Sequence, residues 1–124
     1  MFKRKNKYHA VRTNGRASKL ENAVYQILAL RQKAGEIRNL EEQCTVVLQD
    51  GPKDVQIRWK IDFSFEECED SEFKTWRTVY AEAKGKWTQD FVIKLKLFKK
   101  QKIGPLQIWG GSWQYPKLIQ NFEP

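Results

Sequence analysis

The sequence predicts an α+β domain, with a central mixed and mostly antiparallel β-sheet flanked by helices. Two amphipathic segments with helix start and stop signals, at 20–34 and 89–102, predict the helices. A strictly alternating segment at 55–65 predicts the most clearly marked strand. The expected order of elements is α-β-β-β-α-β, in one domain at 17–124 that follows a basic arm at 1–16.

The first helix is predicted from its cap and its apolar stripe. Ser18-Lys19-Leu20-Glu21 has the S-x-x-E form of a capping box, and Gly35 stands where a C-terminal cap is expected. The apolar residues between them recur at helical spacing: Leu20, Ala23, Val24, Ile27, Leu28 and Leu30. This pattern predicts a helix that buries one side.

Three strands are expected between the two helices. A short apolar run at 44–48 ends at the turn signal Asp50-Gly51-Pro52. In 55–65 the odd-numbered residues are all apolar, so we expect them to face one way. The acidic stretch EECEDSE at 66–72 is expected to be a connection, and 75–84 to return as the second strand of an antiparallel hairpin.

The C-terminal third predicts one more helix and one more strand. Thr88 is the expected N-cap of the helix at 89–102, which has a core stripe of Phe91, Leu95 and Phe98. Ile93 and Leu97 lie on another side of that helix, which suggests a second contact and, with it, a homodimer. A short strand is expected at 106–109, followed by a tail too apolar to be left free.

Charge is unevenly distributed in this chain of net charge +8. Residues 1–16 contain six Lys or Arg and no acid, and 84–102 contains seven Lys against the single acid Asp90. Such segregation suggests a surface that binds a polyanion, although a basic protein kept soluble by its lysines is the alternative.

Composition excludes several classes of site. With one histidine and two cysteines, Cys44 and Cys68, a closed Cys/His zinc site cannot be built. Those thiols are expected to be reduced. No apolar run approaches the roughly 20 residues that span a bilayer, and the basic N-terminus lacks the apolar core of a secretory signal. No membrane partner and a cytoplasmic location are therefore expected.

Glu82 and Lys84 must share one side of the strand at 75–84, because side chains alternate with a period of two. Together with Asp62, they could form a site for a hard divalent cation, with the Ala83 carbonyl as a further ligand. Simple hairpin pairing would separate Asp62 from Glu82 unless the register is staggered. In isolation, Asp62 could be one more polar residue on a strand surface, and Glu82 and Lys84 a weak surface ion pair.

Asp62, followed by Glu82-Ala83-Lys84 at the end of a strand, resembles the D…(D/E)-x-K signature of the PD-(D/E)XK nuclease superfamily. The segments YHAVRTNGRASKLE and KGKWTQDFVIKLKLFKK are similar to small phage nucleases, including junction-resolving enzymes of the endonuclease I type. The resemblance covers about 8–102 and implies a restriction-endonuclease-like core. Ile61 stands where the name of the motif has proline.

The resemblance implies roles for individual residues. Asp62, Glu82 and Ala83 would be ligands of Mg²⁺ or Mn²⁺, Lys84 the catalytic lysine, and Glu21 a further ligand or water-positioning group. The capping box alone also explains Glu21. Lysines and arginines would contact DNA phosphates or simply be solvated; the candidates are Arg4, Lys5, Lys7, Arg12, Arg16, Lys86, Lys94 and Lys96.

The sequence thus predicts a metal-dependent endodeoxyribonuclease of phage type that needs no small-molecule cofactor. Branched DNA, as in a Holliday junction, is the expected substrate by resemblance, and linear duplex DNA is the nearest alternative. Two other classes stay open. One is a non-catalytic DNA-binding protein on the same fold; the other is a protein that binds a host protein through its acidic segment and apolar tail.

Overall fold

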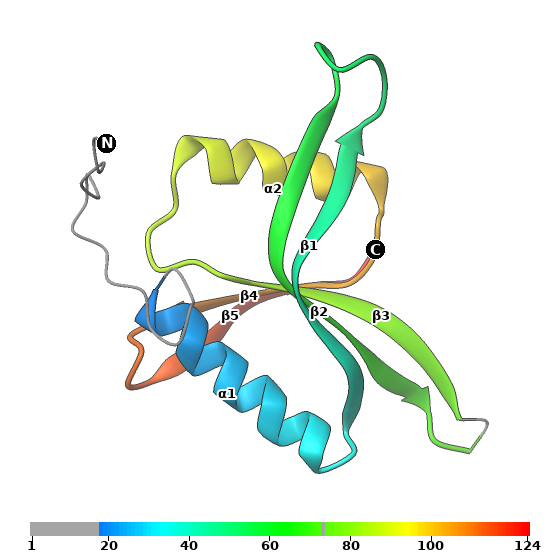
Figure 1. Cartoon of the computed structure of the whole chain (residues 1–124), viewed down its shortest axis with the longest axis vertical. Coiled ribbons are helices and arrows are strands. Elements are labelled where there is room, and N and C mark those ends of the chain that lie inside the picture. The colour runs from blue at the N-terminus through cyan, green and yellow to red at the C-terminus, as the bar shows by residue number, and fades with distance from the viewer. Residues whose placement is uncertain (1–17, 73) are drawn as a thin grey trace, which may run out of the picture.

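A computed structural model describes residues 18–72 and 74–124, and it has the predicted α+β architecture (Figure 1). The predicted arm at 1–16 lies outside the described residues. The chain forms seven elements in the order α1 (Lys19–Lys33), β1 (Ile37–Gln49), β2 (Ile57–Asp70), β3 (Thr75–Ala83), α2 (Gln89–Gln101), β4 (Leu106–Gly111) and β5 (Pro116–Phe122).

All five strands belong to one mixed sheet in the order β1-β2-β3-β4-β5. Three of the four pairings are antiparallel, and the β3–β4 pairing is parallel because α2 connects those two strands. The predicted mixed, mostly antiparallel sheet flanked by helices is therefore confirmed. The apolar tail forms β5, a strand that the sequence pattern did not predict.

Both helices begin at the residues that the sequence predicts. The Ser18 hydroxyl accepts a hydrogen bond from the Glu21 backbone N–H at 3.0 Å, and the Thr88 hydroxyl accepts one from the Phe91 N–H at 3.2 Å. Each cap satisfies one backbone donor that the first helical turn leaves unpaired. Gly35, with φ of +82°, follows α1 in the left-handed conformation that glycine adopts at little cost.

The two helices cover opposite faces of β3 and β4, which run between them (Figure 1). On one face α1 packs Leu20, Val24 and Leu28 into a cluster with Val79 and Ala81 of β3. On the other face α2 packs its stripe against β4, in a cluster that contains Phe91, Leu95, Phe98, Leu106 and Ile108. These clusters hold the ends of β3 and β2 in place between the helices.

The strand β2 supplies both clusters, which corrects the expectation that its odd-numbered residues face one way. Trp59 and Ile61 belong to the α2 cluster, whereas Phe63 and Phe65 belong to the α1 cluster. The 14-residue strand crosses the middle of the fold and continues into a projecting hairpin at each end (Figure 1). Val55 precedes β2 and is 45% exposed, so the predicted start of the strand was two residues early.

The expectation that the acidic stretch at 66–72 is a connection was wrong, because Glu66 to Asp70 extend β2. Glu66 accepts hydrogen bonds from Arg38 and Asn39, and these two donors lower the pKa of its carboxyl group. Arg77 lies between Glu67 and Glu123, with N–O distances of 2.7 Å to each. Cross-strand cations and an amide therefore hold acidic residues in a strand.

The strand β1 is also longer than the short apolar segment at 44–48 from which it was predicted. Its pairing with β2 is irregular between Arg38 and Glu41, and Asn39 and Gln43 have positive φ angles of 54° and 58°. Within the part of the chain that the structure describes, no helix is long and apolar enough to cross a membrane.

Candidate metal and phosphate site

The register of β2 against β3 brings Asp62 next to Glu82. Phe63 pairs with Ala81. Asp62, which precedes Phe63, and Glu82, which follows Ala81, are therefore neighbours across the two strands. The Glu82 Oε1 accepts a hydrogen bond from the Asp62 backbone N–H at 3.2 Å, and the Asp62 Oδ2 accepts one from the Ala83 N–H at 2.9 Å. The expected separation of the two carboxylates was wrong because the long hairpin turns at 71–74 rather than at 66–72.

The four predicted catalytic residues line one pocket of about 460 Å³. It opens between the N-terminal end of α1, the middle of β2 and the segment from the end of β3 to α2. Its walls are formed by Ser18, Glu21, Trp59, Lys60, Asp62, Glu82, Ala83, Lys84, Gly85, Lys86 and Lys94. Three separate elements thus bring carboxylates and lysines to the same place.

Glu82 is a buried carboxyl group, 6% exposed, with a donor at each oxygen. Its Oε2 accepts a hydrogen bond from the Trp59 indole N–H at 3.1 Å, in addition to the Asp62 N–H at Oε1. Burial, reinforced by the side chain of Asp62, raises the pKa of Glu82 to about 9, although Lys84 acts in the opposite direction. At neutral pH this pair of carboxyl groups therefore retains one proton.

Lys84 and three further lysines, Lys60, Lys86 and Lys94, give the pocket its positive charge. The Lys84 backbone N–H donates to the Trp109 carbonyl at 2.8 Å, which fixes the end of β3 against β4. The Lys84 side chain lines the pocket, with its Nζ 5.5 Å from the centre of the Phe91 ring. Of the predicted DNA-contacting residues, Lys86 and Lys94 also line this pocket, whereas Lys96 is exposed outside it.

The remaining predicted DNA contacts lie outside the described residues. They are Arg4, Lys5, Lys7, Arg12 and Arg16.

Glu21 lies in the wall of the pocket, 4% exposed, and its Oε1 accepts a hydrogen bond from the Gln43 amide at 3.0 Å. In 18–72 and 74–124, no three Asp, Glu, His or Cys side chains converge into a cluster that could hold a metal. The geometry therefore supports Asp62 and Glu82 as a pair, and Glu21 lines the same pocket from α1.

Three side chains that line the site or contact it were not predicted: Trp59, Lys60 and Gln43. Trp59 lies on the apolar side of β2 by alternation, and no feature of the sequence indicates that its indole reaches Glu82. Lys60 lies two residues before Asp62 on β2, so the alternation of side chains along a strand predicts that both point to the pocket side. Gln43, which contacts Glu21, depends on a left-handed backbone conformation that a sequence pattern does not reveal.

The donors of the pocket fit a hard divalent cation. Two carboxyl groups lie side by side; burial is the main reason why the pKa of Glu82 is raised, and the neighbouring Asp62 raises it further. The donor atoms are oxygens, and the pocket contains neither of the free cysteines, Cys44 and Cys68. Mg²⁺ and Mn²⁺ prefer oxygen, and Mg²⁺ retains several waters, so two carboxylates and a backbone carbonyl suffice.

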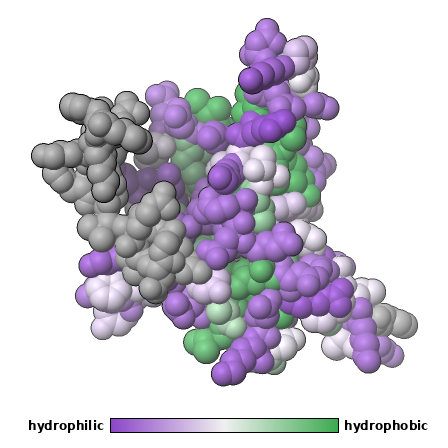
Figure 2. Space-filling view, viewed as in Figure 1, coloured by the Kyte–Doolittle hydropathy of each residue, from purple (hydrophilic) through white to green (hydrophobic). Residues whose placement is uncertain are grey.

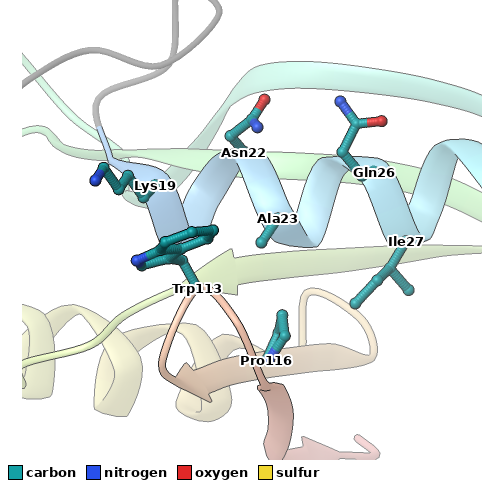
Figure 3. A pocket seen from close by; sticks show the side chains of 7 residues that line it. All are labelled: Lys19, Asn22, Ala23, Gln26, Ile27, Trp113 and Pro116. Carbon is teal, nitrogen blue, oxygen red and sulfur yellow. The ribbon is translucent and has the colours of Figure 1, made fainter.

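A second pocket, of about 510 Å³, lies between α1 and the β4–β5 turn (Figure 3). Its walls are mostly apolar, with Ala23, Ile27, Trp113 and Pro116 beside three polar residues of α1, and they include no carboxylate. The second apolar side predicted for α2 is small, because Leu97 packs partly against the core and only Ile93 is widely exposed, at 51%. The homodimer remains a prediction.

Comparison with known proteins gives a family and no activity. No significant match was found among curated proteins or among solved structures. One family model matches residues 2–118, a range that includes every residue of the carboxylate and lysine pocket. The chain therefore belongs to the family described as "Protein of unknown function (DUF1064)".

Proposed function

We propose that this protein is a metal-dependent endodeoxyribonuclease that acts on structured DNA, with four-way junctions as the leading substrate. One observation supports it above all: Asp62 and Glu82 are hydrogen-bonded neighbours in a pocket that also contains Lys84. A buried carboxyl group beside a second, half-buried carboxyl group and a lysine is costly unless it performs a task. These same residues carry the resemblance to PD-(D/E)XK nucleases.

Asp62, Glu82 and the Ala83 carbonyl would hold Mg²⁺ or Mn²⁺. When bound, that cation supplies charge to polarise the phosphate and to make a water more acidic. The Asp62 N–H and the Trp59 indole keep the Glu82 carboxylate in one orientation. Fixed ligands of this kind need not reorganise as the reaction proceeds.

Lys84 would lie against the reacting phosphate. Its ammonium group stabilises the negative charge that grows as water adds to phosphorus, and it holds that water in line with the leaving group. The bond between phosphorus and the 3′ oxygen then breaks, which gives a 5′-phosphate and a 3′-hydroxyl. Glu21, which lines the pocket from α1, would position the water.

Lys86 and Lys94 would hold the DNA backbone beside the scissile phosphate. Both line the pocket, and phosphate contacts of this type position DNA without reading its sequence. The alternative of binding a host protein through the acidic segment is less well supported, because Glu66 and Glu67 are already paired with Arg38 and Arg77.

The test is cleavage of a labelled four-way junction beside a linear duplex of matching sequence, each with Mg²⁺, Mn²⁺ or EDTA. We expect cutting only with metal and preferentially at the junction. The Glu82→Ala variant should lose this activity, and Glu69→Ala is a matched control because Glu69 is an exposed acid of the neighbouring strand β2, outside the pocket.

Each other outcome has a clear meaning. Equal cutting of both substrates would retain the nuclease and exclude junction selectivity. Binding of both substrates without cutting would overturn the catalytic proposal in favour of a DNA-binding protein on the same fold. Activity that survives Glu82→Ala would show that a contaminant or a different site cuts the DNA.

A further inference from the structure

The hairpin formed by β1 and β2 has an uncovered side that continues from the pocket. Arg58, Lys60 and Asp62 share one side of β2 by alternation, with Gln56 directly before the strand, and both Lys60 and Asp62 line the pocket. This hairpin projects from the body of the fold beside α2 (Figure 1), and its tip is mostly hydrophilic (Figure 2).

The neighbours of Arg58 and Lys60 on that side carry no negative charge. Arg58 pairs with Val47 of β1, and Lys60 pairs with Thr45. All four residues are exposed. The hairpin side therefore has two cations and uncharged neighbours, up to the point where it meets Asp62.

Arg58 differs from the other arginines of the described chain. Arg31, Arg38 and Arg77 each form an ion pair with a glutamate. Among residues 18–72 and 74–124, Arg58 is the one arginine without a carboxylate partner, and its Nε donates to the neutral Gln56 Oε1 at 2.7 Å. Its guanidinium group is thus held in place by an amide while its charge remains available to an anion.

We infer that the exposed side of the β1–β2 hairpin, through Arg58 and Lys60, binds the sugar-phosphate backbone of DNA. This inference rests on the proposed function, since the DNA that reaches Asp62 and Glu82 would have to pass this side. Lys86 and Lys94 line the same pocket, from the segment before α2 and from α2 itself. Together with them, Arg58 and Lys60 would hold a DNA strand at the carboxylates, and the hairpin extends the contact beyond the scissile phosphate.

The experiment is binding of a labelled duplex and a labelled four-way junction in EDTA, measured by fluorescence anisotropy over a range of salt concentrations. Arg58→Ala/Lys60→Ala is the test variant. Lys33→Ala/Lys74→Asn is the control: it removes the same charge from exposed positions at the far end of α1 and at the β2–β3 turn. Asparagine suits the positive φ of 52° at position 74.

We expect the test variant to bind both DNAs roughly tenfold more weakly, with the slope of log affinity against log salt reduced by about 2, one for each lost phosphate contact. The control should stay within about threefold of the wild type. Equal affinities of the test variant and the control would overturn the inference, as would a wild type that does not bind DNA. If the test variant binds DNA more weakly but the wild type does not cleave it, the result would support DNA binding by the hairpin and overturn only the proposed nuclease activity.

Discussion

The Lys84→Ala variant is expected to cut DNA about a hundred- to ten-thousandfold more slowly than the wild type, while it still binds DNA. Lys84 is the one lysine that follows the Glu82-Ala83 pair directly, and its charge acts on the Glu82 carboxyl group. Removing it takes a positive charge away from the place where negative charge grows on the phosphate. The measurement is single-turnover cleavage with enzyme in excess.

Lys86→Ala is the matched control for this experiment. Lys86 lines the same pocket two residues later, but it is more exposed and is proposed only to hold the backbone. We expect its loss to weaken DNA binding and to leave the single-turnover rate at saturating enzyme within about tenfold of the wild type. Equal losses of rate in the two variants would contradict a special role for Lys84.

The Glu82→Gln variant is expected to be more stable than the wild type at pH 8 when metal is absent. The pKa of Glu82 is about 9 in the folded protein, against an ordinary value of 4.5, so the folded state binds an extra proton between these limits. Stability of the wild type must then fall as pH rises from about 4.5 to 9, because the unfolded state binds fewer protons there. Glutamine is neutral throughout and removes this dependence.

The expected gain at pH 8 is about 1 to 2 kcal/mol, with little difference between variant and wild type at pH 4.5. The gain is limited because the glutamine oxygen can accept from only one of the two donors, Trp59 or Asp62. Urea unfolding in EDTA at several pH values measures it. Glu69→Gln, which changes an exposed acid of the neighbouring strand β2, should leave the pH dependence unchanged. If the Glu82→Gln protein keeps the pH dependence of the wild type, that result would contradict the claim that the pair of carboxyl groups retains one proton.

The sequence predicted the helices well because their signals are local. Ser18 and Thr88 cap the two helices as expected, and the stripe of α2 is buried, as are Leu20, Val24 and Leu28 of α1. Leu30, which the predicted stripe of α1 includes, is 67% exposed, so that part of the prediction was wrong. The strand pairing depended on where the hairpin turns, which is not a local property. Glu66 to Asp70 have low strand propensity, and they extend β2 because Arg38, Asn39 and Arg77 reach across from other positions.

That one error about the turn left open whether Asp62 and Glu82 meet. With the turn placed in the acidic stretch, simple hairpin pairing separates them unless the loop is long or the register staggered. With the turn at 71–74, the same alternation makes them neighbours. The residue types and their spacing thus predicted which side chains belong to the site, and the length of the hairpin decided that they meet.

Other contributions to the pocket could not be read from a pattern. Trp59 belongs to the apolar side of β2, yet β2 crosses between two core clusters and turns the indole toward Glu82. Gln43 reaches Glu21 from a left-handed backbone conformation in an irregular strand. Both depend on the shape of β1 and β2 over many residues, which tertiary packing determines.

The central claim is that Asp62 and Glu82 form a site for a divalent cation. Calorimetric titration of Mn²⁺ into the protein at pH 7, repeated in two buffers of different ionisation enthalpy, tests it most directly. We predict binding that releases protons, because the proton shared by the pair must leave, and loss of that binding in both Asp62→Asn and Glu82→Gln. Binding that is unchanged in these two variants, or no binding by the wild type, would contradict the claim.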